Sequence, residues 1–356
     1  MYEIDDTPLP TPPLPGQVVL ATDADDAIER LGIDLVQHAE NCVRRFGDFH
    51  VALSGGVHPR KLYRRLMYAP EFRWIPWRRT HLWFTSERCT GLDDAASTFR
   101  AINDFIGDHS DLPPEQFHPI FAASPTAAMD YERRLREHLG WRERGQDRLD
   151  YVLLTVDAAG ATAGLPAGID PGSLESDGRL VVRTNARGEV AQELSPPDAV
   201  DPAVTDGGHI GAVDGTGLAN DDGEADAANG DASGHVTMLP SIINAARFVA
   251  VLAAGPEPAD GLALAADGAP AAASASAPIP APSPAIAAPI RAIRPVSGEL
   301  TWYVDPPACR QILSPEELAM LAPEPSMSTF DRLGESKNER RLPPLGGDAT
   351  DAANAT

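Results

Sequence analysis

The stretch from Val51 to Pro59 constrains the fold of this chain more than any other segment. Three apolar residues suited to a buried strand lead into Ser54-Gly55-Gly56, and Pro59 then opens a helical pattern. Glycines between a strand and a helix let backbone N–H groups point at an anion, where the positive end of the helix dipole lies. The segment therefore predicts either a phosphate-binding loop or a tight turn that needs a left-handed backbone.

Apolar segments of strand length alternate with helical patterns along most of the chain. Such alternation predicts an α/β fold: a Rossmann-like, mainly parallel sheet with helices on both faces. Ligands of these sheets bind beyond the carboxyl ends of the strands, so the Ser54 turn, Ser86–Arg88 and Asp157–Gly160 are expected to meet there. The expected strands are 16–21, 51–53, 80–84, 149–156, 180–182, 248–253 and 298–305, and the expected helices are 23–46, 59–68, 95–108 and 126–140. After the acidic stretch the fold is expected to resume at 236–240, followed by the start of a helix.

Three of the expected helices have a clear apolar face, and that of the helix over 59–68 carries Leu62, Tyr63, Leu66 and Met67. Asp23 is the expected N-cap of the first. Its core-facing residues are predicted to be Ile28, Leu31, Leu35, Ala39 and Cys42. In the helix over 126–140 the residues predicted to face the core are Met129, Leu135 and Leu139.

Shifts in composition predict a single domain over 16–322 that is interrupted twice. Residues 196–233 carry nine acidic residues and no Lys or Arg, and residues 256–289 are rich in Ala and Pro. Neither stretch buries enough apolar surface to offset the entropy lost on ordering, so both are predicted to be disordered inserts. Residues 1–15 are expected to be a disordered leader and residues 323–356 a disordered tail.

The net charge of −23 argues against nucleic acid or an anionic membrane as a partner. Arginine is concentrated between Arg30 and Arg148, which suits an anionic small molecule or ordinary surface charge. The cysteines are far apart and lack metal-ligand spacing, and no cofactor motif is present. With no signal peptide pattern and no apolar run of about 18–20 residues, a reduced cytoplasmic protein without metal or cofactor is expected.

Six segments, in order, resemble motifs of the 6-phosphogluconolactonase family, whose fold is shared with the glucosamine-6-phosphate isomerases. The family's Ser-Gly-Gly-Ser-Thr-Pro resembles residues 54–59, its Gly-Asp-Glu-Arg residues 85–88, and its Ser-Asn-Tyr-Arg residues 97–100. Its Gly-Met-Gly-x-Asp-Gly-His-Thr-Ala-Ser-Leu is similar to residues 155–165. Its Val-Thr-Leu-x-Leu-Pro with Asn-Ala-Ala-Arg is similar to 236–247, and its closing Arg-Pro-x-x-Gly-Glu-Leu-Thr-Trp-x-Val-Asp to 294–305.

The resemblance implies metal-free hydrolysis of a sugar-phosphate lactone, 6-phosphogluconolactone, in the pentose phosphate pathway. It implies a histidine as general base on a water and an aspartate that orients it, while an arginine and small-residue loops hold the phosphate. Here the histidine position is Ala161 and the aspartate position is Ala159. Since alanine neither accepts nor relays a proton, no catalytic residue is assigned. The predicted phosphate-binding residues are Ser54, Gly55, Gly56 and Arg88.

Other positions also depart from the family's pattern. The aspartate of the second motif is Ser86, and the two hydroxyl residues of the phosphate loop are Val57 and His58. The lysine expected after the penultimate strand falls near Pro258. Glu87 and Thr162 are retained, and Thr162 is interpreted as a helix cap rather than a ligand. For Arg88 two interpretations stay open: bidentate phosphate binding, or a structural salt bridge with Glu87 or another carboxylate.

No residue is an obvious replacement for the base. His58, in the phosphate loop, is interpreted as a surface or capping residue, with anion binding or base catalysis as the alternative. Asp157 is interpreted as the cap of the following turn rather than a substitute acid. His81 is expected to be a packed or edge residue, and His209 and His235, in or beside the acidic insert, are poor catalytic candidates.

Three hypotheses of different classes follow. The first is a divergent 6-phosphogluconolactonase, supported by the ordered motifs. The second is a non-catalytic relative that serves as a sugar-phosphate sensor or a protein-interaction platform, and the third is a relative that binds nothing. The lost base at Ala161 favours a non-catalytic protein.

Overall fold

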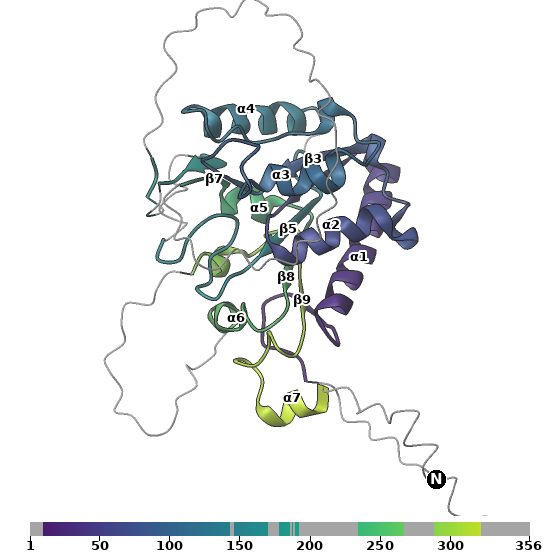
Figure 1. Cartoon of the computed structure of the whole chain (residues 1–356), viewed down its shortest axis with the longest axis vertical. Helices are drawn as coiled ribbons and strands as arrows, with labels where there is room; N and C mark the ends of the chain where they lie inside the picture. Colours follow the sequence, from purple (N-terminus) through teal and green to yellow (C-terminus); the bar gives the residue numbers. More distant parts are fainter. Residues whose placement is uncertain are drawn as a thin grey trace, which may run out of the picture. The chain divides into compact units, whose positions relative to one another are not determined.

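The computed structural model describes residues 10–142, 146–169, 178–185, 187, 189–191, 234–266 and 288–321 (Figure 1). The expected acidic insert, the expected tail and most of the expected leader lie outside the described residues. Across the described ranges, no helix is both long and apolar enough to cross a membrane.

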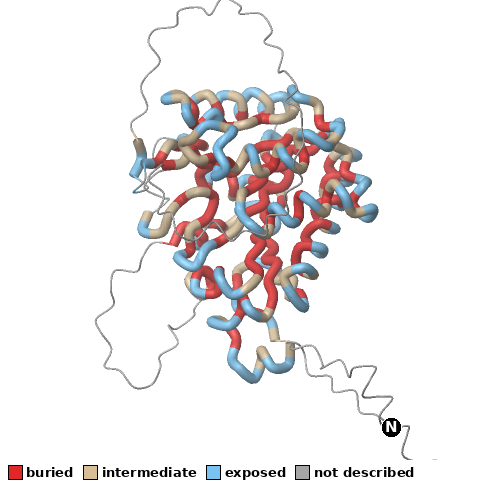
Figure 2. Tube along the Cα trace, in the orientation of Figure 1, coloured by how far each residue is buried: buried red, intermediate tan, exposed pale blue. Residues whose placement is uncertain are grey.

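A six-stranded parallel sheet forms the centre of the described chain, as the sequence predicted. Every neighbouring pair of strands is parallel, and the strands β2 and β8 are buried along their whole length. Full burial is typical of strands covered on both faces, and the sheet forms a continuous buried centre in Figure 2. The strand order is β1 (Gln17–Leu20), β9 (Glu299–Val304), β8 (Phe248–Ala253), β5 (Tyr151–Thr155), β2 (Phe49–Leu53) and β3 (Thr80–Phe84).

A second sheet of three antiparallel strands continues from the carboxyl end of the first. Its order is β4 (Ser86–Arg88), β7 (His235–Met238) and β6 (Val181–Arg183). Only Thr85 separates β4 from β3. The sequence predicted a strand near β6 and only a resumption of the fold near β7. It did not predict a separate sheet, because pairing of segments so far apart leaves no local signal.

Helices cover both faces of the parallel sheet. The helix α1 (Ala24–Phe46) contacts β2, β8 and β9 and packs against α2 (Val57–Tyr68). In Figure 1, α5 (Pro240–Ala245) and α6 (Ala259–Ala265) lie on the other side of the strands. The helix α4 (Ala127–Gly140) contacts β6 and β7, so it covers the small sheet. The shorter helical segments are η1 (Pro70–Phe72), η2 (Trp77–Arg79), α3 (Thr98–Ile102), η3 (Asn103–Gly107), η4 (Pro114–Gln116), η6 (Pro289–Ala292) and α7 (Pro315–Leu321).

The first helix confirms its sequence signals. Asp23 Oδ1 accepts the backbone N–H groups of Asp25 and Asp26, each at 2.9 Å. Gly47 ends the helix at a φ of 92°. The predicted stripe from Ile28 to Cys42 is buried throughout, and burial of such apolar side chains contributes about 1.5–3 kcal/mol each for the larger ones.

Two helix boundaries differ from the prediction. The helix expected from Pro59 begins at Val57, directly after Gly56, because Pro is well tolerated within a first helical turn. The helix expected over 95–108 is the short α3 followed by η3, which is a π-helical turn. Ser97 accepts the N–H of Arg100 at 3.2 Å and so fixes the start of α3.

Two further expectations are wrong in part. Met129 does not face the core: it is 37% exposed, because the buried face of α4 runs through Ala128, Tyr131, Leu135 and Leu139. Within the expected insert 256–289, residues 259–265 form α6. Leu262 and Ala265 are buried there, so three-residue spacing of apolar side chains overrides the Ala/Pro-rich composition. Residues 267–287 of this insert lie outside the described residues.

Candidate functional site

A cleft of about 490 Å³ lies beyond the carboxyl ends of β2, β3 and β5. The Ser54 turn, the strand β4 and the turn at Asp157 all contribute to its lining. The expected convergence of these three segments is therefore observed. The lining includes Ser54, Gly55, Gly56, Arg60, Ser86, Arg88, Thr98, Thr155, Asp157, Ala161, Thr162, Gly164, Thr184, Asn185 and His235.

The loop from Ser54 to Gly56 is held rigidly at the start of α2. The Ser54 hydroxyl donates to Leu153 O at 2.7 Å and lies 2.8 Å from the Thr85 hydroxyl. This side chain therefore ties β2 to its neighbouring strands, and the contribution to an anion falls to the backbone. Gly56 has a φ of 118°, which only glycine adopts readily.

The carboxylate of Glu87 organises the wall that contains Arg88. It is 1% exposed and accepts the N–H groups of Arg88, Thr98 and Phe99 at 2.7–2.9 Å. It also accepts the Ser97 hydroxyl at 3.1 Å. Burial raises the pKa of Glu87, and these four donors act in the opposite direction. Glu87 therefore anchors the start of α3, while Arg88 lines the cleft.

The turn after β5 is held by the carboxylate of Asp157. Asp157 Oδ1 accepts the N–H of Ala159 at 2.9 Å and that of Ala161 at 2.8 Å. The interpretation of Asp157 as a turn cap is thus confirmed. Thr162 is not a helix cap, because no helix begins there; its hydroxyl donates to Thr155 O at 2.7 Å.

His235 lines the cleft, which the sequence analysis did not foresee. It is the first residue of β7 and lies opposite Arg88 in the antiparallel pair β4–β7. Residues paired in this way present their side chains on the same face of a sheet. In the sequence His235 directly follows the acidic insert, and for that reason it was considered a poor candidate. The apolar residues that follow it indicated the ordered segment on which it lies.

The other histidines singled out from the sequence lie elsewhere. His58 is half-buried beside Gly255 and is not a lining residue of the cleft, and burial lowers its pKa. His81 lies near the amino end of β3, whereas the cleft lies beyond the carboxyl ends of the strands. His209 lies outside the described residues.

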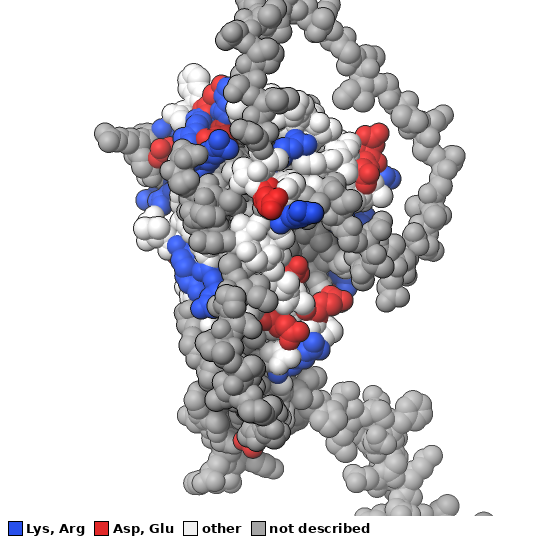
Figure 3. All heavy atoms as spheres, turned by 90° about the vertical axis from the view of Figure 1, so that its left-hand side faces the viewer, with Lys and Arg blue, Asp and Glu red and all other residues white. Residues whose placement is uncertain are grey.

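The surface charge of the described residues is mixed. On the face in Figure 3, Lys and Arg side chains are scattered among acidic and neutral ones rather than gathered into one basic surface. Two arginines, Arg60 and Arg88, line the cleft.

Comparison with known proteins fits this geometry. Residues 22–192 match the family described as glucosamine-6-phosphate isomerases/6-phosphogluconolactonase. This region is a little under half of the chain, and over it the chain is similar to that family. The human GDH/6PGL endoplasmic bifunctional protein is 33% identical over 159 residues, which cover 41% of this chain and 19% of that protein. The 6-phosphogluconolactonase of Treponema pallidum is 30% identical over 118 residues, which cover 32% of this chain and 48% of that enzyme. The chain thus spans between about a fifth and a half of the length of these relatives.

Two solved structures share the fold over most of their length. A devB protein superposes with a TM-score of 0.59 at 22% identity, covering 83% of this chain and 99% of the other. The 6-phosphogluconolactonase from Trypanosoma cruzi gives a TM-score of 0.58 at 18% identity, covering 85% of this chain and 98% of the other. At these identities the likeness establishes the α/β fold.

Proposed function

We propose that this protein binds a phosphorylated six-carbon sugar acid, or its lactone, in the cleft and does not catalyse hydrolysis of the lactone. The observation that carries the proposal is the pairing of the retained Ser54-Gly55-Gly56 turn with Ala161 at the position of the family's general base. Binding and chemistry rest on different residues of this cleft, so one can persist without the other.

The anion-binding half of the cleft supports a phosphate ligand. The backbone of Gly55 and Gly56 leads into α2, a helix of 12 residues, whose positive end faces the loop. Arg60 and Arg88 line the same cleft, and a guanidinium binds phosphate through two parallel hydrogen bonds. The small polar side chains of Ser86, Thr98 and Asn185 suit the hydroxyl groups of a sugar.

The catalytic half lacks a proton acceptor at the expected place. Hydrolysis requires that a water be deprotonated as it attacks the lactone carbonyl, and a positioned base contributes about 10²–10⁴ in rate. Asp157 is the acidic residue among those that line the cleft. Its Oδ1 already accepts two backbone N–H groups, those of Ala159 and Ala161. This arrangement favours a binding protein over a lactonase.

His235 supports a second candidate function, a lactonase with a relocated base. Its imidazole lines the cleft opposite Arg88, and histidine is the side chain best suited to proton transfer near neutral pH. Under this alternative the purified protein accelerates lactone hydrolysis and His235→Gln abolishes the acceleration.

Calorimetry and a rate assay together test the proposal. Titration of 6-phosphogluconate into the full chain is expected to release or absorb heat that saturates, and the binding is expected to weaken in Arg88→Ala. Hydrolysis of 6-phosphogluconolactone is expected to proceed at its spontaneous rate. A sample that folds but gives no saturable heat overturns the binding claim, and acceleration sensitive to His235→Gln selects the lactonase instead.

A further inference from the structure

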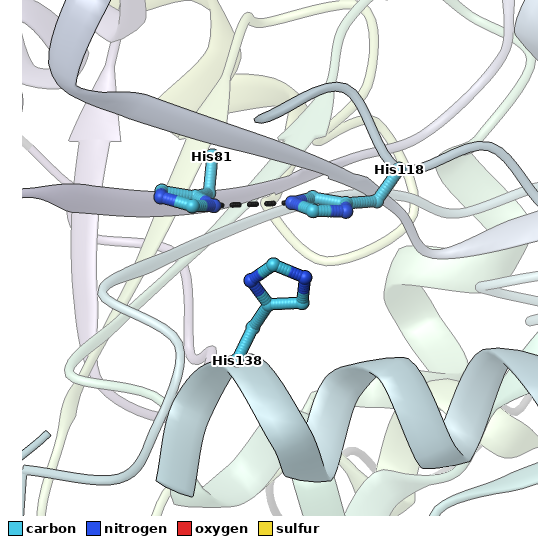
Figure 4. A group of neighbouring side chains, drawn as sticks. All are labelled: His81, His118 and His138. Carbon is cyan, nitrogen blue, oxygen red and sulfur yellow. Dashed lines mark hydrogen bonds between the residues drawn. The ribbon is translucent and has the colours of Figure 1, made fainter. Parts of the chain in front are cut away.

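Three histidines meet at the end of the sheet that lies away from the cleft. His81 is the second residue of β3, and His138 lies in the last turn of α4. The N–H of His118, just after η4, donates to Leu82 O at 3.0 Å, which holds this segment beside β3. Figure 4 shows the three rings gathered between the strand and the helix. Ser86, on the cleft, is five residues further along from His81, roughly 16 Å at about 3.3 Å per residue.

The ring nitrogens are spaced as ligands of one ion would be. One nitrogen of each ring lies within 4.8 Å of the others, and His81 Nδ1 is 3.1 Å from His118 Nε2. In a tetrahedral zinc site with Zn–N bonds of about 2.0–2.1 Å, two ligand nitrogens are about 3.3–3.4 Å apart. An ion between the rings would replace the His81–His118 hydrogen bond, and the His138 nitrogen, within 4.8 Å of the other two, would complete the set by moving toward it.

We propose that His81, His118 and His138 bind a divalent transition-metal ion, with Zn²⁺ as the expected occupant. The donor set is three imidazoles, which suit Zn, Cu or Ni, whereas Ca²⁺ and Mg²⁺ prefer oxygen ligands. Three protein ligands leave the fourth tetrahedral position for water.

Aromatic packing fixes two of the rings before an ion binds. The His118 ring stacks on Trp83, with centroids 3.8 Å apart and planes 12° apart. The His81 ring stacks on His50, with centroids 4.3 Å apart and planes 1° apart. Ligands held in this way lose little conformational entropy on binding, as a preformed site requires.

A neighbouring group, Asp48, His50 and His81, is a weaker candidate. The Trp83 indole N–H donates to His50 Nδ1 at 3.2 Å, and His50 Nε2 lies 3.4 Å from Asp48 Oδ2. Asp48 also pairs with Arg142 at 2.5 Å. Since both Asp48 and His50 are engaged, they act as supports that orient His81 rather than as ligands.

The protonation and exposure of the three residues suit ligation. Burial lowers the pKa of His81 to about 3 and that of His118 to about 2, so both imidazoles are neutral near pH 7. His81 and His138 are half-buried, which leaves an ion a route to the site.

The bound ion would have a structural role, independent of the ligand in the cleft. β3 is the edge strand of the parallel sheet. An ion held by His81, His118 and His138 would join that edge to the segment after η4 and to the end of α4. The segment after η4 already bridges this edge through Phe117 and Leu82, and the ion would fasten it there.

The test uses tag-free full chain that has been stripped of metal with a chelator. On titration with Co²⁺, one equivalent is expected to give the visible absorption of a four-coordinate ion, and added Zn²⁺ is expected to displace it. Elemental analysis after dialysis against Zn²⁺ is expected to give one zinc per chain. His138→Gln is the decisive variant, because His138 is only half-buried on the helix and its replacement should disturb folding least. His109→Gln is the matched control, because His109 is exposed and lies outside the cluster.

His138→Gln is expected to weaken Zn²⁺ binding by at least about tenfold. Loss of a residue that only hydrogen-bonds to a metal ligand already lowers metal affinity by about tenfold to a hundredfold. His109→Gln is expected to bind as the wild type does. Circular dichroism confirms that each variant is folded. Zinc binding that is equal in wild type and His138→Gln, or a folded wild type that binds no zinc, overturns the proposal.

Discussion

Asp157 accepts the backbone N–H of Ala161 at 2.8 Å, at the residue where the 6-phosphogluconolactonase family is expected to carry its general base. The same oxygen accepts the N–H of Ala159 at 2.9 Å. The turn that presents position 161 to the cleft is thus stabilised by its own carboxylate and does not depend on the missing histidine. A fold can therefore keep this turn after the reactive side chain has gone.

Restoring the pair Ala159→Asp and Ala161→His is expected to produce lactonase activity. Ala161 lines the cleft, so an imidazole there can reach a water above a bound lactone. A positioned base contributes about 10²–10⁴ in rate. The measurement is 6-phosphogluconolactone hydrolysis against the spontaneous reaction, with Ala161→Gln as a control of similar size that supplies no base. A double variant that binds 6-phosphogluconate but hydrolyses nothing contradicts the idea that the lost base alone silences the cleft.

Arg88→Ala is expected to weaken binding of 6-phosphogluconate. A hydrogen bond to a charged group contributes about 1.5–3 kcal/mol, which is roughly tenfold or more in Kd. Arg88→Lys should recover part of the affinity, since it keeps the charge but not the planar fork. The control is Arg30→Ala, which removes an exposed arginine paired with Asp26 on α1. Equal affinity in Arg88→Ala and Arg30→Ala would place the anion elsewhere.

Gly56→Ala is expected to destabilise the protein and to impair the anion loop. The φ of 118° is strained for any residue with a Cβ atom, at a cost of about 1–3 kcal/mol. Urea unfolding followed by tryptophan fluorescence measures the loss. Gly140→Ala, at the end of α4 with open space around it, should be neutral or slightly stabilising. A Gly56→Ala protein as stable as Gly140→Ala would contradict the described loop.

Asp150→Asn is expected to lower the free energy of unfolding by about 3–5 kcal/mol, because it removes the buried carboxylate that pairs with Arg247 and leaves Arg142 paired with Asp48 alone. The Asp150 side chain is 0% exposed and lies 2.7 Å from Arg142 and 2.8 Å from Arg247. Asp130→Asn removes an exposed pair with Arg133 and should cost no more than about 1 kcal/mol. Similar urea midpoints for the two variants would show that the buried network contributes little.

The sequence predicted the parallel sheet well because its strands are continuous apolar runs between amphipathic helices. Val51–Leu53 and the run at 248–253 carry that signal locally, and both are buried strands. It did not predict the small antiparallel sheet or the exposure of Met129. Those depend on contacts between segments far apart in the chain, which periodicity does not report.

The candidate site was predictable only in part. Ser54–Gly56 and Arg88 line the cleft as expected, since they follow the ends of neighbouring parallel strands. The sequence did not predict that His235 also lines the cleft, because its position depends on the register between β4 and β7. The histidine cluster was likewise hidden: His81, His118 and His138 come from three separate segments, and their spacing in sequence follows no metal-binding pattern.

The most direct test of binding without reaction is a ³¹P NMR time course of 6-phosphogluconolactone with excess full-length protein. The phosphate resonance is expected to shift or broaden on binding, while the lactone disappears no faster than it does without protein. A resonance unchanged by the protein would contradict the phosphate site. Hydrolysis faster than the spontaneous reaction would contradict the claim that the cleft has lost its chemistry.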